Sequence, residues 1–174
     1  MMARREKNVL HFTFSSMESK IIERVLAAII ANYQLPPAEL DEKSATVWYS
    51  RRGCESARMT PEETADWLKQ LHNVRSARVE HLQLWLGNLR GRQPGPCTLS
   101  IGIEKAEALM TALNDHRLLL AARHDIGEAE MEMRNIAAVA RMPPEKQVAL
   151  AEIDFLAYVI EAILHLLNPA REES

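Results

Sequence analysis

The apolar run at residues 144–167, PEKQVALAEIDFLAYVIEAILHLL, most constrains what this chain can fold into. At 100° per residue, Asp154, Tyr158, Glu161 and His165 fall within one narrow stripe of a helix, and most other positions are apolar. A helix of this kind needs cover from other elements on most of its sides. We therefore expect it to be the centre of a helical bundle.

A membrane-spanning helix is the competing interpretation of the same run, because about 20 apolar residues cross a bilayer. Against it, Glu152, Asp154 and Glu161 all lie inside the run. An Asp near the bilayer centre costs about 2.5–3.5 kcal/mol. No other stretch resembles a second span, so we expect no membrane partner.

The composition favours helix over sheet. Aromatic residues make up 5% of the 174 residues, Gly occurs 6 times, and Ala, Leu, Glu and Arg are common. The length suffices for one domain with a substantial core. We expect a single helical domain over residues 1–174.

The charge and cysteine content exclude several classes of partner. A formal net charge of −3 gives no overall attraction to nucleic acid. Cys54 and Cys97 form no CxxC or Cys/His pattern typical of zinc, and no signal-peptide core follows the basic N-terminus. We expect a cytoplasmic protein with reduced thiols, no metal, no cofactor and no nucleic-acid partner.

Periodicity predicts the order of the elements. Alternation of Leu10, Phe12 and Phe14 predicts a strand over 9–14, and a second strand is expected over 98–101, so the two could pair as a small ribbon. Capping signals and apolar arcs predict further elements. The expected fold is mainly α: a bundle of four long helices and one short helix with a minor two- or three-stranded β element. The helices are expected over 16–33, 60–89, 103–124 and 144–167, with the short one over 128–140.

Residues 35–60 form a long connection that begins with Pro36 and Pro37. Within it, 46–49 could form one strand, and 51–54 is expected to be an exposed loop. A connection of this length in a compact domain is either functional or mobile.

Three arginines occupy positions where a core-facing arc calls for apolar residues. Arg75 and Arg78 project into the apolar arc of helix 60–89, and Arg117 projects into the arc that we assign to helix 103–124. The last helix offers the complement, Asp154 and Glu161, two turns apart. Because a buried charge is costly unless it is paired, we expect these arginines to meet the two carboxylates, partly buried.

Three interpretations of this cluster remain open. The ion pairs can be structural and fix the register of the helices. An arginine left without a carboxylate can instead bind a phosphate or carboxylate ligand. The arginines can also extend to solvent along their aliphatic stems.

No catalytic constellation is visible. The sequence holds neither a P-loop nor GxGxxG, and the spacing of His116 and His124 does not match a metal site. His72 and His81 beside Arg75 and Arg78 suggest a solvated face rather than a nucleic-acid stripe. An enzyme stays open as a class, since active sites assemble from distant residues.

The segment ALMTALNDHRL at 108–118 carries a family resemblance that continues through 121–126 and the last helix. It resembles DUF2017, a bacterial family known only as a domain of unknown function, most strongly over 103–167. The resemblance implies that Asn114, Asp115 and Arg117 matter for packing or for a partner. Genes of the family that it resembles often lie beside a protease-adaptor gene, so the resemblance implies at most a role near regulated proteolysis.

The function we expect is therefore that of a non-enzymatic interaction or regulatory protein with an unidentified protein partner. The apolar excess of the last helix predicts a homodimer, because three neighbouring helices would leave part of it uncovered. The alternative is a small-anion or nucleotide-binding helical protein that uses Arg75, Arg78 and Arg117.

Overall fold

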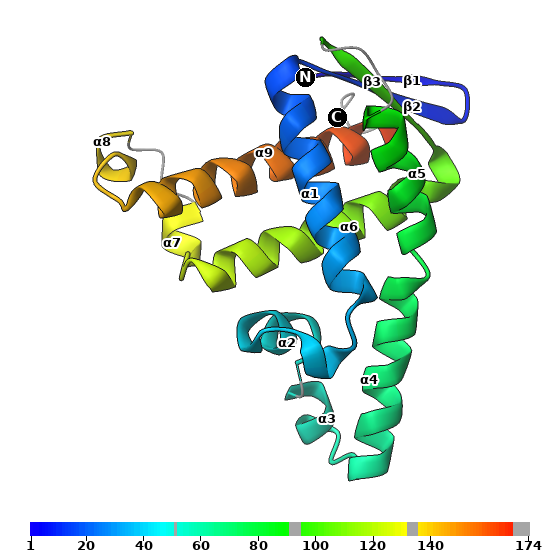
Figure 1. Cartoon of the computed structure of the whole chain (residues 1–174), viewed down its shortest axis with the longest axis vertical. Helices are drawn as coiled ribbons and strands as arrows, with labels where there is room; N and C mark the ends of the chain where they lie inside the picture. Colours follow the sequence, from blue (N-terminus) through cyan, green and yellow to red (C-terminus); the bar gives the residue numbers. More distant parts are fainter. Residues whose placement is uncertain (51, 91–94, 132–135, 169–174) are drawn as a thin grey trace.

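The computed structural model describes residues 1–50, 52–90, 95–131 and 136–168. The chain is mainly helical, with a small three-stranded antiparallel sheet at one end (Figure 1). The sheet order is β1-β2-β3, formed by β1 (Met2–Glu6), β2 (Val9–Phe14) and β3 (Cys97–Gly102). The predicted fold class is confirmed at this level.

The predicted ribbon of two strands is confirmed as the pairing of β2 with β3, in which Phe12 lies opposite Leu99. Leu10, Phe12 and Phe14 are buried, as their alternation predicts. β1 adds a third strand on the other edge of β2. Its sequence, MARRE, is mostly exposed and polar, so periodicity gave no sign of it.

The helical elements follow in chain order. The bounds are α1 (Ser16–Gln34), η1 (Pro37–Glu39, a 3-10 helix), α2 (Glu42–Trp48), α3 (Arg52–Ser56), α4 (Pro61–Ser76), α5 (Val79–Arg90), α6 (Ile103–Arg123), α7 (Glu128–Met131), α8 (Ile136–Val139) and α9 (Pro144–Leu167). The predicted capping box at Ser15 and the predicted N-cap at Thr60 are confirmed, and Thr60 also forms a capping box. The short helix expected over 128–140 consists of α7 and α8, and residues 132–135 between them lie outside the described part.

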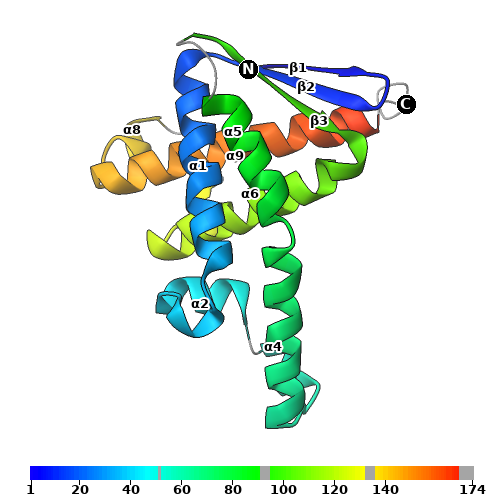
Figure 2. The same cartoon turned by 45° about the vertical axis from the view of Figure 1, so that its right-hand side comes forward.

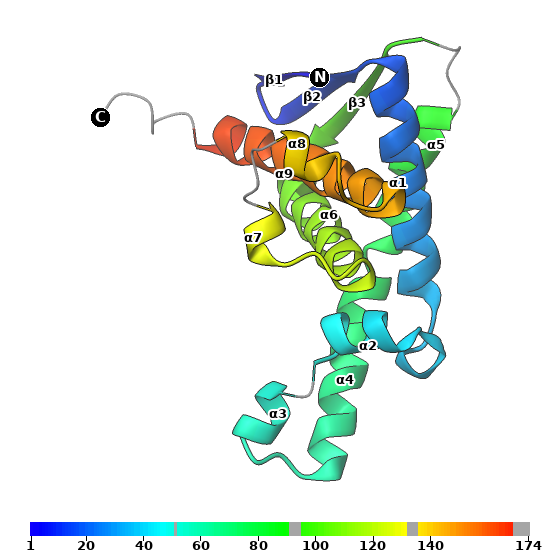
Figure 3. The same cartoon turned by 90° about the vertical axis from the view of Figure 1, so that its left-hand side faces the viewer.

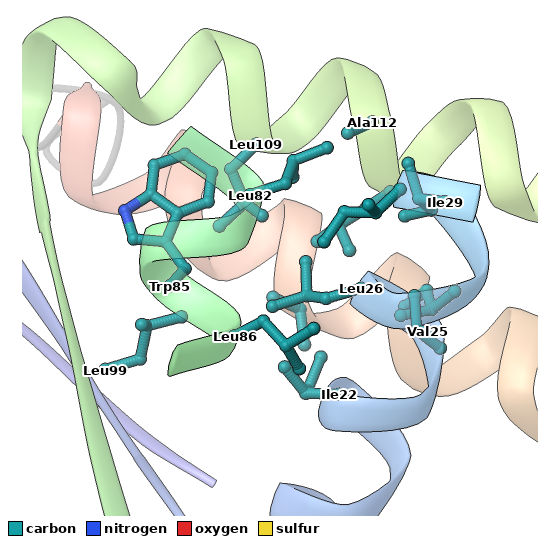
Figure 4. Packing of buried hydrophobic residues seen from close by; sticks show 14 of the residues in the cluster. Ile22, Val25, Leu26, Ile29, Leu82, Trp85, Leu86, Leu99, Leu109 and Ala112 are labelled. Carbon is teal, nitrogen blue, oxygen red and sulfur yellow. The ribbon is translucent and has the colours of Figure 1, made fainter. Parts of the chain in front are cut away.

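The main hydrophobic core joins elements that are far apart in the sequence. Figure 4 shows side chains of α1 and α5 meeting β3 and α6. Leu26 of α1, Leu82 of α5 and Leu113 of α6 have no exposed surface. A smaller cluster forms beneath the C-terminal end of α6, around Leu150 and Ile153 of α9. The shared core supports the single domain that we propose for 1–174.

The last helix has the predicted bounds but less cover than expected. α9 packs along α6 and buries one face that includes Leu150, Ile153 and Leu156. Its opposite stripe, with Asp154 and Glu161, faces solvent. The expected place of α9 at the centre of a bundle of four long helices is not confirmed, because α9 lies between the sheet and α6 and is crossed by α1 (Figure 1).

The connection 35–60 is largely helical. The strand expected at 46–49 is wrong, because 42–48 forms α2, whose N-cap Asp41 accepts a hydrogen bond from the Ser44 backbone N–H. Of the predicted loop 51–54, residue 51 lies outside the described part and the rest begins α3, with Cys54 buried.

The single helix predicted over 60–89 is two helices, α4 and α5, which meet at Ala77 and Arg78. α5 buries the predicted arc, but α4 has no buried residue. α4 extends away from the rest of the molecule, with α3 beside its N-terminal end (Figures 2 and 3). We call α3 and α4 the arm. The predicted bundle of four long helices is thus not found in that form.

No helix in the described ranges has the length and apolar content to cross a membrane.

Candidate functional site

A buried polar cluster lies where α1, α2, α4 and α6 meet, and its centre is Asp115 of α6. The Tyr33 hydroxyl donates to Asp115 Oδ2 at 2.6 Å, and Arg75 Nε donates to the same oxygen at 3.1 Å. The Trp48 ring N–H donates to the Asp115 backbone carbonyl at 2.9 Å. The Arg75 and Asp115 side chains are each only 12% exposed. One aspartate therefore ties together all four helices, and we call these residues the Asp115 cluster.

Aromatic rings enclose the Arg75 guanidinium. Its central carbon lies 5.7 Å from the ring centroid of Trp48 and 5.0 Å from that of Tyr49. Tyr33 and Trp48 pack edge to face, with ring centroids 5.4 Å apart. Rings around a cation replace part of the water that burial removes from it. The pair of Arg75 with Asp115 is therefore stabilised on several sides.

The hydroxyl of Tyr33 stays protonated in this setting. Burial raises the pKa of Tyr33 well above its usual value, and the negative charge of Asp115 raises that pKa further. The phenol is therefore a fixed donor to the carboxylate. Ser76, at the end of α4, also reaches α1 by donating its hydroxyl to the Tyr33 backbone carbonyl at 3.1 Å.

The predicted pairing of the arginines with the last helix is wrong. Asp154 and Glu161 lie on the exposed stripe of α9, and neither forms an ion pair with a described residue. Arg75 pairs with Asp115 instead. Arg78 is half-buried and forms no ion pair with a described residue, although its positive charge acts on Tyr33.

The residues of the family motif have different surroundings. Asp115 is the centre of the cluster, whereas Asn114 is exposed. Arg117 is half-buried, and its Nη1 donates to Asn114 Oδ1 at 3.4 Å. Its Nε atom is buried without a hydrogen-bond partner in the described chain. Arg117 is therefore not part of the Asp115 cluster.

The sequence could have revealed Asp115 through a different choice of face on α6. The predicted arc ran through Met110, Leu113 and Arg117, and of these only Leu113 is buried. From Leu113 the buried face of α6 continues through Leu109, Ala112 and Leu119, away from Met110 and Arg117. Apolar residues occur almost all around the second half of α6, so period alone could not choose between the two faces.

A second polar cluster joins α1, α6 and α9, and we call it the Glu152 cluster. Glu152 of α9 is buried and accepts a hydrogen bond from Arg24 Nη2 of α1. Its other oxygen, Oε1, lies 3.0 Å from Nε2 of the buried His116 of α6. Nδ1 of His116 has no hydrogen-bond partner in the described part of the chain. Sequence reasoning missed this cluster, because Glu152 is an isolated charge among apolar residues of α9.

The ionised form of Glu152 is favoured here. Burial by itself raises the pKa of Glu152, but the hydrogen bond with His116 and the positive charge of Arg24 outweigh burial, so the pKa lies below its ordinary value. An ionised carboxylate requires a donor at His116 Nε2, because it can only accept. In the neutral ring, Nδ1 is then an acceptor.

Consecutive residues of α6 therefore serve two clusters. Asp115 faces α2 and α4, whereas His116 faces α9. Their directions differ because successive side chains on an α-helix are about 100° apart.

A third set of contacts fixes α2 on the C-terminal end of α6. The Asp41 carboxylate accepts hydrogen bonds from the side chains of Ser44 and Arg123. Hydrogen bonds from the Ser44 side chain and backbone, and then Arg123, hold the pKa of Asp41 far below its ordinary value. Lys43 Nζ also donates to the Arg123 backbone carbonyl at 3.1 Å.

Beside these contacts, η1, α2, α3 and α4 border two adjoining recesses of about 610 and 480 Å³. Glu55 and Leu68 line both recesses, Tyr49 lines the larger and Cys54 the smaller. Most other lining residues are small or apolar. We call the two recesses together the arm groove.

Within the described ranges, no three His, Cys, Asp or Glu side chains are grouped to hold a metal ion. Cys54 and Cys97 are both free and buried.

The architecture and the two clusters define a mainly helical protein in which buried ion pairs join the helices and a small antiparallel sheet lies at one end. A family model described as "Domain of unknown function (DUF2017)" matches residues 71–167, more than half of the 174 residues. The chain belongs to this family. The matched range begins within α4, so the sheet strands β1 and β2, the helices α1 to α3 and the start of α4 precede it. Searches of curated proteins and of solved structures gave no match.

Proposed function

We propose that this chain is a non-enzymatic interaction or regulatory protein of the cytoplasm that receives a segment of a partner protein in the arm groove. The observation that carries the proposal is that α4, with sixteen residues, has no buried residue. An amphipathic helix ordinarily buries its apolar face. The apolar side chains Trp67, Leu68 and Leu71 of α4 are only half-buried.

The chemistry of the groove favours an apolar partner segment that carries a Lys or Arg. Ala45, Leu68 and Met59 supply apolar surface to the recesses. Glu55 is the ionisable acidic group in their lining, and its carboxylate forms no ion pair with a described residue. In helix-in-groove recognition the apolar face of an amphipathic helix fills such a groove, and a complementary charge at its rim adds specificity.

The Asp115 cluster holds α2 and α4, two of the helices that border the groove, against α6. Arg75 and Ser76 fix the end of α4 to α6 and α1, while Trp48 fixes α2 to α6. A binding surface needs this kind of support, because ordering a loose surface opposes binding. The family resemblance directs the search for a partner to components of regulated proteolysis.

Photocrosslinking in the native cell tests the proposal. p-Benzoylphenylalanine at Leu68 should give an adduct with one partner protein, and the same group at the exposed Leu164 of α9 should not. An untagged wild-type chain added as a competitor should reduce the adduct yield, and an untagged chain with Leu68→Asp should not. Equal adducts from both positions, or none from position 68, would contradict the proposal.

The homodimer predicted from the sequence is tested in the same experiment. An adduct at twice the mass of the chain would show that a second copy fills the groove, and light scattering at tens of micromolar would confirm it. The outward stripe of α9 carries Asp154, Glu161 and His165, so we assign a second copy to the arm rather than to α9.

One observation favours the alternative of a small-anion or nucleotide-binding protein. Arg78 is half-buried and forms no ion pair with a described residue, whereas the charge of Arg75 is matched by Asp115. Thermal denaturation with inorganic phosphate or ATP separates the two functions. A ligand at a hundredfold excess over Kd stabilises by about 2.7 kcal/mol, and Arg78→Gln should remove any such gain.

A further inference from the structure

A third recess, separate from the two that form the arm groove, opens over the Glu152 cluster. It has a volume of about 410 Å³ and lies between α1, α6 and α9. Its apolar lining comes from Ala28 of α1, Leu120 of α6, and Val148 and Ala149 of α9. Val148 is 60% exposed although it is a large apolar residue. We call this recess the α1–α9 groove.

The charged groups that line the α1–α9 groove are unevenly matched. The guanidinium of Arg24 is already paired with Glu152. Glu145, in the first turn of α9, is exposed and forms no ion pair with a described residue. Among the arginine and carboxylate side chains of the lining, Arg24 is matched by Glu152, whereas Glu145 faces no cation of its own. Glu145 is therefore the carboxylate that a bound cation can pair with.

Two histidines also line the groove. His116 Nε2 lies 3.0 Å from Glu152 Oε1, and its buried Nδ1 has no hydrogen-bond partner in the described part of the chain. His124, at the C-cap of α6, also lines the groove. The C-terminal end of a helix attracts positive charge, since its last carbonyl groups point outward there.

We propose that the α1–α9 groove binds a small apolar amine. Its ammonium group lies against Glu145 and beside His124 at the end of α6, and its apolar body covers Val148, Ala149, Leu120 and Ala28. Burial of the apolar body supplies most of the affinity, since it removes the exposed side chain of Val148 from water. The unmatched carboxylate supplies the preference for a cation. This site is independent of the partner site in the arm.

Three probes that share a phenyl group and differ in their polar end test the charge requirement. They are 2-phenylethylamine, 2-phenylethanol and 3-phenylpropionate, each titrated into the full chain and followed by two-dimensional amide NMR. The amine should bind most tightly and the carboxylate least. The shifted amides should be those around 24–28, 116–124 and 145–152.

Matched variants on α9 test the two parts of the site. Glu145→Gln should weaken binding of the amine about two- to fivefold, the range expected for one exposed ion pair, and should leave binding of the alcohol unchanged. Glu161→Gln, an exposed change on the same helix, should have no effect. Val148→Arg should abolish binding of all three probes, whereas Leu164→Arg should not. All four positions are exposed, so circular dichroism should show wild-type folding.

Several results would overturn the proposal. One is equal binding of the three probes, and another is tighter binding of the carboxylate. A wild-type affinity of Glu145→Gln for the amine would remove the assigned role of that carboxylate. Amide shifts confined to the arm would move the ligand to the other groove, and no binding by any probe would remove the site.

Discussion

Asp115 accepts hydrogen bonds from two side chains through one carboxylate oxygen, and its own backbone carbonyl accepts a third. Removal of this residue would leave the Tyr33 hydroxyl and the Arg75 guanidinium without their acceptor in a nearly dry setting. An uncompensated buried charge is more costly than the absence of the whole pair. The effect of a substitution here should therefore be large.

We predict that Asp115→Ala lowers the free energy of unfolding by about 3–5 kcal/mol, the usual cost of breaking a buried pair by removing one partner. For a chain of this size that corresponds to a fall in melting temperature of about 10 °C. Differential scanning calorimetry measures both.

Asp154→Ala and Glu161→Ala are the matched controls, because both side chains face solvent on α9. Each should change stability by no more than about 0.5 kcal/mol. A large loss in either control, with Asp115→Ala near wild type, would restore the ion pairs expected from the sequence.

At the scale of elements, local signals predicted much of the fold. Capping boxes at Ser15 and Thr60 marked the starts of α1 and α4, and alternation marked β2. The long apolar run gave both ends of α9. These features depend on residues that are close in the sequence, so one sequence is enough to recognise them.

The predictions of secondary structure and pairing that were wrong depended on tertiary contacts. Helix 60–89 reads as one amphipathic unit, yet it breaks at Ala77 without Gly or Pro, where Ser76 and Arg75 bond to α1 and α6. α2 is helical because Asp41 caps it and its ring residue Trp48 reaches α6. The partner of Arg75 was mistaken because the apolar residues of α6 allow two faces.

We predict that α4 is the least stable of the long helices. Helices whose surroundings provide few buried apolar contacts open locally at low free energy. Hydrogen exchange should therefore be faster for amides 65–73 of α4 than for amides 22–30 of α1, although both helices begin with a capping box.

Thr60→Ala removes the α4 cap and should lower the local opening free energy by about 1 kcal/mol. Exchange should accelerate in α4 and stay unchanged in α1. Equal protection of the two helices in the wild type would show that the arm is better packed than its exposed surface indicates.

At the scale of the whole molecule, carboxylates connect distant segments. Glu152 joins α9 to α1 and α6, and Asp41 joins the start of α2 to the end of α6. Both have folded-state pKa values below the ordinary range. A carboxyl group with a lowered pKa stabilises the fold above its unfolded-state pKa, and this contribution is lost as the pH falls toward the folded-state value.

We therefore predict that the melting temperature is nearly constant near neutral pH and falls from about pH 5 downward, where unfolded carboxyl groups begin to bind protons. Glu152→Gln should have a lower melting temperature than wild type at pH 7, but its melting temperature should fall less between pH 5 and pH 3. For Glu161→Gln the melting temperature should fall with pH as steeply as it does for wild type. Parallel slopes for wild type and Glu152→Gln would show that this carboxylate does not contribute to acid sensitivity.

The neighbouring positions of Asp115 and His116 restrict how this family can change in length. One residue inserted earlier in α6 would turn both side chains by about 100°, so the aspartate would leave Arg75 and the imidazole would leave Glu152 in a single event. An insertion in the turn between α3 and α4, at residues 57–58, would leave both contacts and the α2 residues beside them in place. Variation in length among homologues should therefore be tolerated in that turn and be absent from α6.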